Sequence, residues 1–258
     1  MSEVYDCFMF YNELDLLEIR LNEMDSEVDK FVIVEAELTH QRTPKPMFFA
    51  ENKQKYEKFL DKIIHIVVPA SVFNDDSWHN DNIQRTYMLK GIEEAKDDDF
   101  IIMSDCDEIV SQKTLNHVKN NFVHDAYIFN QNFYLWYLNT RAKGMIWHNA
   151  GIAKKKKIQE IGTLYFKNNK TCLLLPRVDN GGWHFSYIGS PENCKTKLNS
   201  FGHREFAHLS IEELKYNRDN LLDPLGRKDE GIDIITDPIE MMPNYVQQNV
   251  EKFKHLIR

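Results

Sequence analysis

Three acidic side chains stand within four residues near the middle of the chain: Asp105, Asp107 and Glu108. They follow an apolar run at residues 100–103, whose shortness and branched side chains predict a buried strand. In an extended segment Asp105 and Asp107 project to the same side, where two carboxylates repel each other unless a cation lies between them. Hard oxygen donors suit Mg²⁺ or Mn²⁺, and a metal ion held there can bridge the phosphates of a nucleotide. The alternative is an acidic loop in solvent.

The chain before these acids alternates between strands and helices. Residues 4–10, 31–34 and 63–68 are apolar runs that predict three buried strands. Apolar side chains at helical spacing predict a helix that begins at Glu13, with Asn12 as its N-cap. A strand, a helix and a strand in this order imply a right-handed parallel crossover. Further helices are predicted at residues 51–60 and, after a polar loop at 74–81, up to about residue 95.

The second half of the sequence is less regular. An aromatic-rich segment at residues 126–138 predicts one or two strands, and residues 183–187 predict another. Ser190 and Pro191 are typical of a helix start, with the serine as cap and the proline in the first turn. From about residue 211 onward the pattern predicts mainly helix.

Composition and charge limit the classes of protein to consider. The chain has 258 residues, 42% hydrophobic and 28% charged, without a repeat or linker, which predicts one globular domain over residues 1–258. The net charge of −8 argues against nucleic acid as a partner. No apolar run approaches the roughly 20 residues of a membrane span, and we expect no signal peptide. A lysine run at residues 154–157 is interpreted as a solvated edge or turn. Four scattered cysteines indicate free thiols and a cytoplasmic location: Cys7, Cys106, Cys172 and Cys194.

Several short stretches are specific together because of their number and order. They are residues 12–20, 44–46, 105–109 and 182–186, followed by Pro191 and Glu192. With them the chain resembles glycosyltransferase family seventeen, whose animal members add the bisecting N-acetylglucosamine (GlcNAc) to N-glycans. Residues 245–257 are similar to the last helix of that family. Residues 139–175 look shorter and different, which leaves the acceptor open because acceptor contacts usually come from variable loops.

The family resemblance implies a fold and a reaction. The fold is GT-A, an α/β fold with a mostly parallel central sheet flanked by helices and the Asp-x-Asp motif at the end of a core strand. The reaction is an inverting, metal-dependent transfer of a sugar, with GlcNAc expected, from a UDP-sugar to a hydroxyl group of a glycan acceptor. Mn²⁺ or Mg²⁺ is the implied cofactor. We expect this chain to lack the cytoplasmic tail, membrane anchor and stem of the animal members.

The resemblance also implies roles for residues around the reacting groups. Asp107 is the first choice as metal ligand and Asp105 the second, with the ribose as an alternative partner of Asp105. Glu108 either supports them or is a surface acid. His184 is assigned to the metal or the diphosphate, with a structural histidine as the alternative. Glu192 is the candidate general base, with an acid that only stabilises a helix start as the alternative. Other candidates are His203 for the histidine and Glu205 and Asp179 for the base.

The nucleoside is expected at the carboxyl ends of the first two strands, where Phe10, Asn12 and Glu35 lie. The carboxylate of Glu35 can accept hydrogen bonds from uracil or ribose, or be an ordinary loop acid. Arg85 is expected to pair with a phosphate or to hold the first acid of the motif, and a structural salt bridge is the alternative. Trp183 can stack on a sugar or belong to the core.

Two other classes of protein compete with this interpretation. Haloacid-dehalogenase-like phosphatases also place Asp-x-Asp after an apolar strand, but they normally carry Thr or Val where this chain has Ile109. Their motif also usually opens the domain, whereas three strands are predicted before it here. A non-catalytic sugar-binding module would need neither a donor nor a metal.

Overall fold

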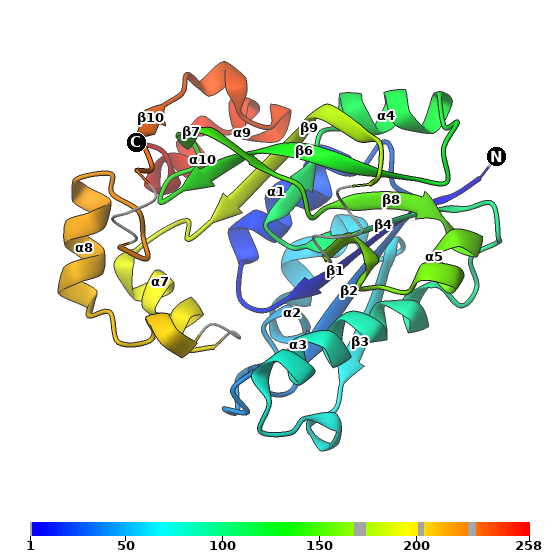
Figure 1. Cartoon of the computed structure of the whole chain (residues 1–258), viewed down its shortest axis with the longest axis horizontal. Helices are drawn as coiled ribbons and strands as arrows, with labels where there is room; N and C mark the ends of the chain where they lie inside the picture. Colours follow the sequence, from blue (N-terminus) through cyan, green and yellow to red (C-terminus); the bar gives the residue numbers. More distant parts are fainter. Residues whose placement is uncertain (1, 168–173, 201–203, 227–230) are drawn as a thin grey trace.

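Ten strands form one sheet in the part of the chain that the computed structural model describes, residues 2–167, 174–200, 204–226 and 231–258. Their order is β10-β7-β6-β8-β4-β1-β2-β3, and β9 pairs with β6 and β5 beside this path. Figure 1 shows the sheet crossing the molecule with helices on both sides. The strands are β1 (Val4–Phe10), β2 (Lys30–Ala36), β3 (Ile63–Val68), β4 (Phe100–Asp105), β5 (Glu108–Val110), β6 (Ala126–Leu135), β7 (Thr140–Trp147), β8 (Gly151–Lys154), β9 (Arg177–Ser186) and β10 (Ile234–Thr236).

The two halves of the sheet differ in strand direction. The neighbours β4, β1, β2 and β3 are parallel, as the strand–helix–strand order predicts. Beyond β4 the pairs β4–β8, β8–β6, β6–β7 and β7–β10 are antiparallel, whereas β6 and β9 are parallel. The α/β class with a central sheet flanked by helices is therefore confirmed, and its parallel pairing is concentrated in the first half of the chain.

Helices cover both faces of this sheet. One core cluster joins the sheet to α1, α4, α9 and α10, and a second joins it to α3, η3 and α5. A third lies between α7, α8 and the far ends of β6 and β7. The α-helices are α1 (Leu14–Met24), α2 (Phe48–Asn52), α3 (Ser77–Thr86), α4 (Gln112–Asn120), α5 (Lys155–Ile161), α7 (Pro191–Leu198), α8 (Ile211–Asp219), α9 (Asn244–Gln248) and α10 (Val250–Phe253). The 3₁₀-helices are η1 (Lys53–Phe59), η2 (Ala70–Val72), η3 (Tyr87–Ile92), η4 (Tyr165–Lys167), η5 (Arg204–Phe206), η7 (Ile239–Met241) and η8 (Lys254–Leu256).

Strand β1 illustrates how one strand contributes to both faces. Val4 and Phe8 belong to the cluster beneath α1, whereas Tyr5 and Cys7 belong to the cluster beneath η3. Side chains alternate along a strand, so Asp6 falls on the α1 side and is fully buried there. A buried carboxylate needs a partner, and α1 provides one.

The start of α1 corrects one prediction. The helix begins at Leu14 and its cap is Glu13, so Asn12 is not the N-cap. The carboxylate of Glu13 accepts hydrogen bonds from the backbone N–H groups of Tyr11 and Asn12, at 3.2 and 3.1 Å. These bonds hold the chain in a bend before the helix, which delays the first helical turn by one residue.

The predicted helices before β3 and β4 exist, but each is divided into an α-helix and a 3₁₀-helix. The first is α2 followed by η1, and within η1 the backbone leaves helical geometry at Tyr56. The second is α3 followed by η3, and it begins after Asp76, whose carboxylate accepts from the N–H groups of Trp78 and His79. The helix start predicted at Ser190 is confirmed as α7.

The lysine run is not the solvated edge that its charge suggested. Residues 155–157 begin α5, and Lys155 is buried. Its ammonium group donates to the carbonyl oxygens of Glu93 and Ala95. A buried ammonium is tolerated here because backbone oxygens satisfy it.

The C-terminal part is less helical than predicted. Residues 234–236 form β10 and pair with β7, where helix was expected. The predicted last helix at residues 245–257 consists of three short pieces, α9, α10 and η8. Near-neighbour periodicity could not detect a strand whose partner, β7, lies about ninety positions earlier in the chain.

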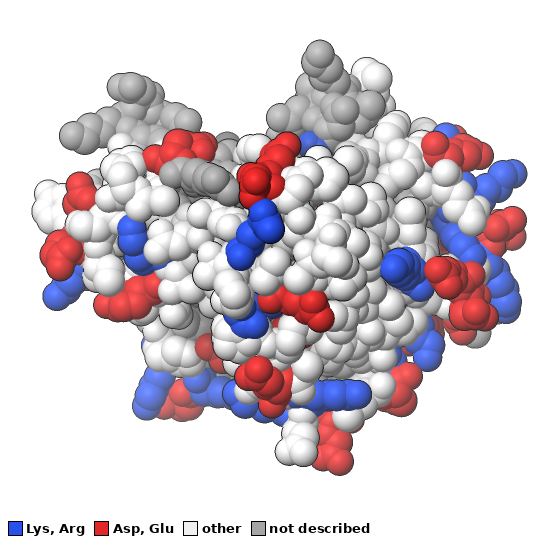
Figure 2. Space-filling model, turned by 90° about the horizontal axis from the view of Figure 1, so that it is seen from below, with Lys and Arg blue, Asp and Glu red and all other residues white. Residues whose placement is uncertain are grey.

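The described cysteines agree with the expectation of free thiols. Cys7, Cys106 and Cys194 are free and buried, while Cys172 lies outside the described residues. Figure 2 shows one face of the molecule, on which acidic and basic side chains are interspersed. None of the described helices has the length and apolar character that crossing a membrane requires.

Candidate active site

An acidic turn joins β4 to β5 at the edge where the parallel strands end. Asp105 is the last residue of β4 and Glu108 the first of β5, so Cys106 and Asp107 form the turn. The N–H group of Asp105 donates to Oε2 of Glu108 at 2.8 Å, which closes the turn. Ligands of α/β sheets bind just past the carboxyl ends of such strands.

Arg20 of α1 holds this turn from beneath. Its Nη1 atom donates to the carbonyl oxygens of Asp105, Cys106 and Glu108, at 2.8, 3.3 and 3.0 Å. Its Nε and Nη2 atoms donate to the carboxylate of Asp6 at 2.7 and 2.6 Å, and both side chains are fully buried. The backbone that carries the acids is thereby fixed to α1 and β1.

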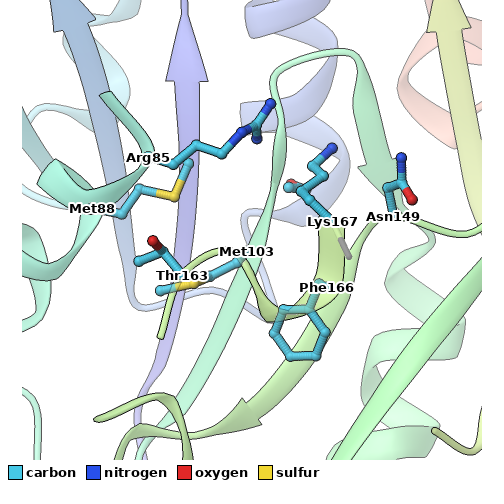
Figure 3. A pocket seen from close by; sticks show the side chains of 8 residues that line it. Arg85, Met88, Met103, Asn149, Thr163, Phe166 and Lys167 are labelled. Carbon is cyan, nitrogen blue, oxygen red and sulfur yellow. The ribbon is translucent and has the colours of Figure 1, made fainter. Parts of the chain in front are cut away.

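Two cations hold the carboxylate of Asp105 from above. Arg85 of α3 reaches Oδ1 at 2.5 Å and is itself held by Asp81, and Lys167 reaches Oδ2 at 2.8 Å. Lys167 also donates to Glu108 at 2.7 Å. Burial acts to raise the pKa of Asp105, but Arg85 and Lys167 outweigh it and hold that pKa well below its usual range. Arg85 and Lys167 approach from opposite sides of a small pocket, with their charged ends toward the same rim (Figure 3). The pocket is lined by Arg85, Met88, Met103, Ser104, Asn149, Thr163, Phe166 and Lys167.

Asp107 is more deeply placed, with only 5% of its surface exposed. Its Oδ2 accepts a hydrogen bond from Nζ of Lys197, on α7, at 2.7 Å, and its Oδ1 lies 3.6 Å from Nε2 of His184. Burial acts to raise the pKa of Asp107, but Lys197 and then His184 reverse the direction and lower it. Asp107 is therefore ionised at neutral pH.

An aromatic wall closes the site behind these acids. Trp147 donates from Nε1 to Oε1 of Glu108 at 2.6 Å, and its ring lies 4.3 Å from that of His184. Phe133 covers the imidazole from another side, with ring centres 4.9 Å apart. Nδ1 of His184 is buried and has no hydrogen-bond partner among the described residues. His184 thus presents Nε2 to Asp107 from a largely apolar surround.

The two carboxylates of the turn are donors of the kind that a hard divalent cation prefers. Within the described ranges, no three His, Cys, Asp or Glu side chains form a group that could hold a metal ion. Mg²⁺ is commonly bound by one or two carboxylates together with substrate phosphates and water, and Asp105 and Asp107 supply that number. Each has a positively charged nitrogen within 2.8 Å, so positive charge is stabilised at both positions.

The comparison with protein families decides the family. The sequence model described as Glycosyltransferase family 17 matches residues 1–258. The chain belongs to glycosyltransferase family 17.

Two relatives of this family 17 chain are rat and human proteins named β-1,4-mannosyl-glycoprotein 4-β-N-acetylglucosaminyltransferase. Each is 23% identical to it over 292 residues, which cover 95% of this chain and 53% of the relative. The chain therefore spans about half the length of these relatives.

Among solved structures, 4-diphosphocytidyl-2C-methyl-D-erythritolsynthase from Anaerococcus prevotii matches at 9% identity and a TM-score of 0.39, over 69% of this chain and 87% of that one. A likeness of that size does not bear on the function of this chain.

The residues predicted to bind the nucleoside lie close to the acidic turn, but two of them, Phe10 and Glu35, are buried in contacts with other protein groups. Phe10 is buried in the core, edge-on to Phe49 at 6.4 Å. Glu35 is fully buried and accepts from the N–H of Phe49 at 2.9 Å and from His65 at 3.1 Å. Asn12 is partly exposed and lines a cavity beside α7. The nucleoside roles of these three residues remain predictions.

Trp183 and Glu192 are not part of the cluster around the turn. Trp183 packs against the core beneath α1 and donates from Nε1 to the carbonyl of Met241 at 2.8 Å. Glu192 is exposed on the first turn of α7, and no hydrogen bond or ion pair in the described part of the chain links it to Asp107. Both roles remain predictions. His203 lies outside the described residues, and Asp179 accepts a hydrogen bond from Asn130 at 2.8 Å.

Four residues of the site were not assigned from the sequence: Arg20, Trp147, Lys167 and Lys197. A charged Asp6 within an apolar strand was a usable signal for a buried basic partner such as Arg20. Arg20 also stands in one of the stretches that resemble the family. The two lysines gave no such signal, because they meet the acids only through the folding of distant segments.

Proposed function

We propose that this chain is an inverting, metal-dependent glycosyltransferase that moves GlcNAc from a UDP-sugar to a hydroxyl group of a glycan. The observation that carries the proposal is the pair Asp105 and Asp107 at the carboxyl edge of the parallel strands, surrounded by Arg85, Lys167 and Lys197. Membership of family 17 and the names of the relatives support the reaction class and the sugar.

The residues around the turn suit the departure of a diphosphate. Asp107 and Asp105 would hold Mn²⁺ or Mg²⁺, which when bound neutralises charge on the leaving group. Arg85, Lys167 and Lys197 supply three further positive groups within hydrogen-bond distance of the two acids. Arginine and lysine are the side chains that recognise phosphate oxygens. The site can therefore both bind the donor and stabilise the UDP that leaves.

The acceptor hydroxyl needs a base, and Glu192 is the candidate. It stands on the first turn of α7, the helix that carries Lys197. A hydrogen bond with Ser190, with a smaller contribution from backbone N–H, lowers the pKa of Glu192. The carboxylate is thus ionised and ready to accept a proton at neutral pH, although its basicity is modest.

The substitution Asp107→Asn tests the donor site. It keeps the shape of the side chain and removes the charge that a cation needs. We expect metal-dependent UDP binding, measured by calorimetry with Mn²⁺, to be lost while the circular dichroism spectrum stays that of the parent. UDP affinity equal to that of the parent protein would refute the proposed site.

The substitution Glu192→Gln tests the base. We expect UDP and metal binding to be kept and sugar transfer to fall by roughly 10²-fold or more. Transfer at the parental rate would place the base elsewhere, with Glu205 and Asp179 the next residues to replace.

Release of UDP from the UDP-sugar distinguishes an enzyme from a sugar-binding module. Without acceptor, a transferase releases UDP slowly, whereas a sugar-binding module releases none.

A further inference from the structure

Lys197 is a partly buried side chain whose ammonium group has one strong partner. Its Nζ donates to Oδ2 of Asp107 at 2.7 Å and lies 5.4 Å from the centre of the Tyr187 ring. Burial acts to lower the pKa of Lys197, but Asp107 and then Glu13 outweigh it and raise that pKa. The side chain is therefore charged at neutral pH, and its charge compensates that of Asp107.

Lys195, on the same helix, has a structural role, because its ammonium group donates to backbone carbonyls. Its Nζ donates to the carbonyl oxygens of Ala207 and Leu209, at 2.7 and 2.8 Å. These carbonyls belong to the segment that leads into α8, so Lys195 ties that segment to α7. Within the described residues the ammonium group of Lys197 donates to no backbone carbonyl; its hydrogen bond goes to a carboxylate of the candidate site.

Lys197 also borders open space. A cavity of about 120 Å³ lies beside it and is lined in part by Asn12, Glu13, Tyr187 and Asn193. Glu13 therefore gives the ammonium group a second acidic neighbour on the cavity side. A long, flexible side chain next to a cavity can change its position without unpacking the core.

A divalent cation at Asp107 would compete with Lys197 for the same carboxylate. Two positive groups close to one oxygen repel each other, and a donor diphosphate brings new negative charge to the same place. We propose that Lys197 occupies the cation position beside Asp107 in the free protein and moves from it to the diphosphate of the donor when a divalent cation binds. This inference rests on the proposed function, since it requires a metal-bound nucleotide at this turn.

The proposal predicts effects of opposite sign when the charge of Lys197 is removed. In Lys197→Met, metal alone meets no competing cation, so its affinity rises. The nucleotide at saturating metal loses one charge-assisted contact, so its affinity falls. Each change should be on the order of tenfold, the effect of one such contact.

The experiment measures two dissociation constants on the full chain. Mn²⁺ binding without nucleotide is followed by electron paramagnetic resonance, and UDP binding at saturating Mn²⁺ by calorimetry. Lys197→Met should tighten the first and weaken the second, whereas Lys197→Arg, which keeps the charge, should leave the first close to parental. Lys113→Met, which removes an exposed lysine of α4, is the matched control and should change neither.

The outcomes separate this proposal from the proposed function. Suppose that the parent binds UDP with Mn²⁺ but Lys197→Met weakens both affinities or changes neither. The proposed movement of Lys197 is then wrong, while the proposed donor site is still supported. If the parent binds UDP equally with and without metal, and Lys197→Met abolishes that binding, Lys197 replaces the metal and the proposed movement is also wrong. If the parent binds neither Mn²⁺ nor UDP, the proposed function fails and this inference fails with it. Thermal unfolding of each variant verifies that the folded protein is being compared.

Discussion

The acidic turn has two sets of ion pairs, and they are built differently. Beneath it, Arg20 is fully buried, paired through two nitrogens with Asp6 and bonded to three backbone carbonyls of the turn. Above it, Lys167 and Lys197 are 17% and 25% exposed, and each contacts carboxylates only through one ammonium group. The lower set is planar and directional, whereas Lys167 and Lys197 of the upper set are flexible side chains with point charges.

This difference indicates which pairs hold the fold and which serve the ligand. A buried guanidinium that makes six hydrogen bonds to oxygen atoms cannot be removed without leaving uncompensated polar groups. An ammonium group at the edge of a site can be replaced by another cation or by water. We therefore expect substitutions below the turn to act on stability and substitutions above it to act mainly on binding.

The largest effect is expected for Arg20→Met. This change leaves Asp6 charged and buried and removes the hydrogen bonds to the turn, so the free energy of unfolding should fall by about 3–5 kcal/mol. Urea unfolding followed by circular dichroism measures the loss. The double variant Asp6→Leu with Arg20→Met removes both charges and should recover part of it. A loss below about 1 kcal/mol for the single variant would show that the lower set is no more structural than an exposed pair.

A smaller and pH-dependent effect is expected for Asp107→Asn. The folded pKa of Asp107 lies below its unfolded value of about 3.9, so the charge contributes its full stability above that value. As the pH falls, Asp107 takes up a proton in the unfolded chain before it does so in the folded protein. The contribution of its charge to the free energy of unfolding is then lost as the pH approaches the lowered pKa of the folded state. The difference in unfolding free energy between parent and variant should therefore be constant above about pH 5 and shrink below about pH 4. Urea unfolding at pH 7, 5 and 3.5 measures it, and a difference independent of pH would contradict the ionic role of Asp107.

The smallest effect on stability is expected for Lys167→Met. Asp105 keeps Arg85 and Glu108 keeps Trp147, so each acid retains a partner when the ammonium group is removed. Water can reach the vacated position, and the loss should be up to about 1 kcal/mol. Urea unfolding beside Arg20→Met gives the comparison directly. Equal losses for the two variants would remove the distinction between the lower and upper sets.

The sequence by itself determined the first half of the fold. The runs at β1 and β3 were predicted with their observed bounds, because apolar runs between turn signals mark buried strands without knowledge of their neighbours. It also determined that Asp105 and Asp107 stand at the end of a core strand, and that Ser190 begins a helix through a side-chain cap. These features depend on interactions between residues close together in the chain.

Only the tertiary structure decided which groups surround the acids. Arg85 and His184 were expected near them, but Lys167 and Lys197 reach Asp105 and Asp107 from 62 and 90 positions away in the sequence. The antiparallel half of the sheet and the burial of Lys155 likewise depend on contacts between distant segments. Spacing along a chain fixes which side chains share a face of one element, whereas the charge, burial and partners of a site depend on how separate elements pack together.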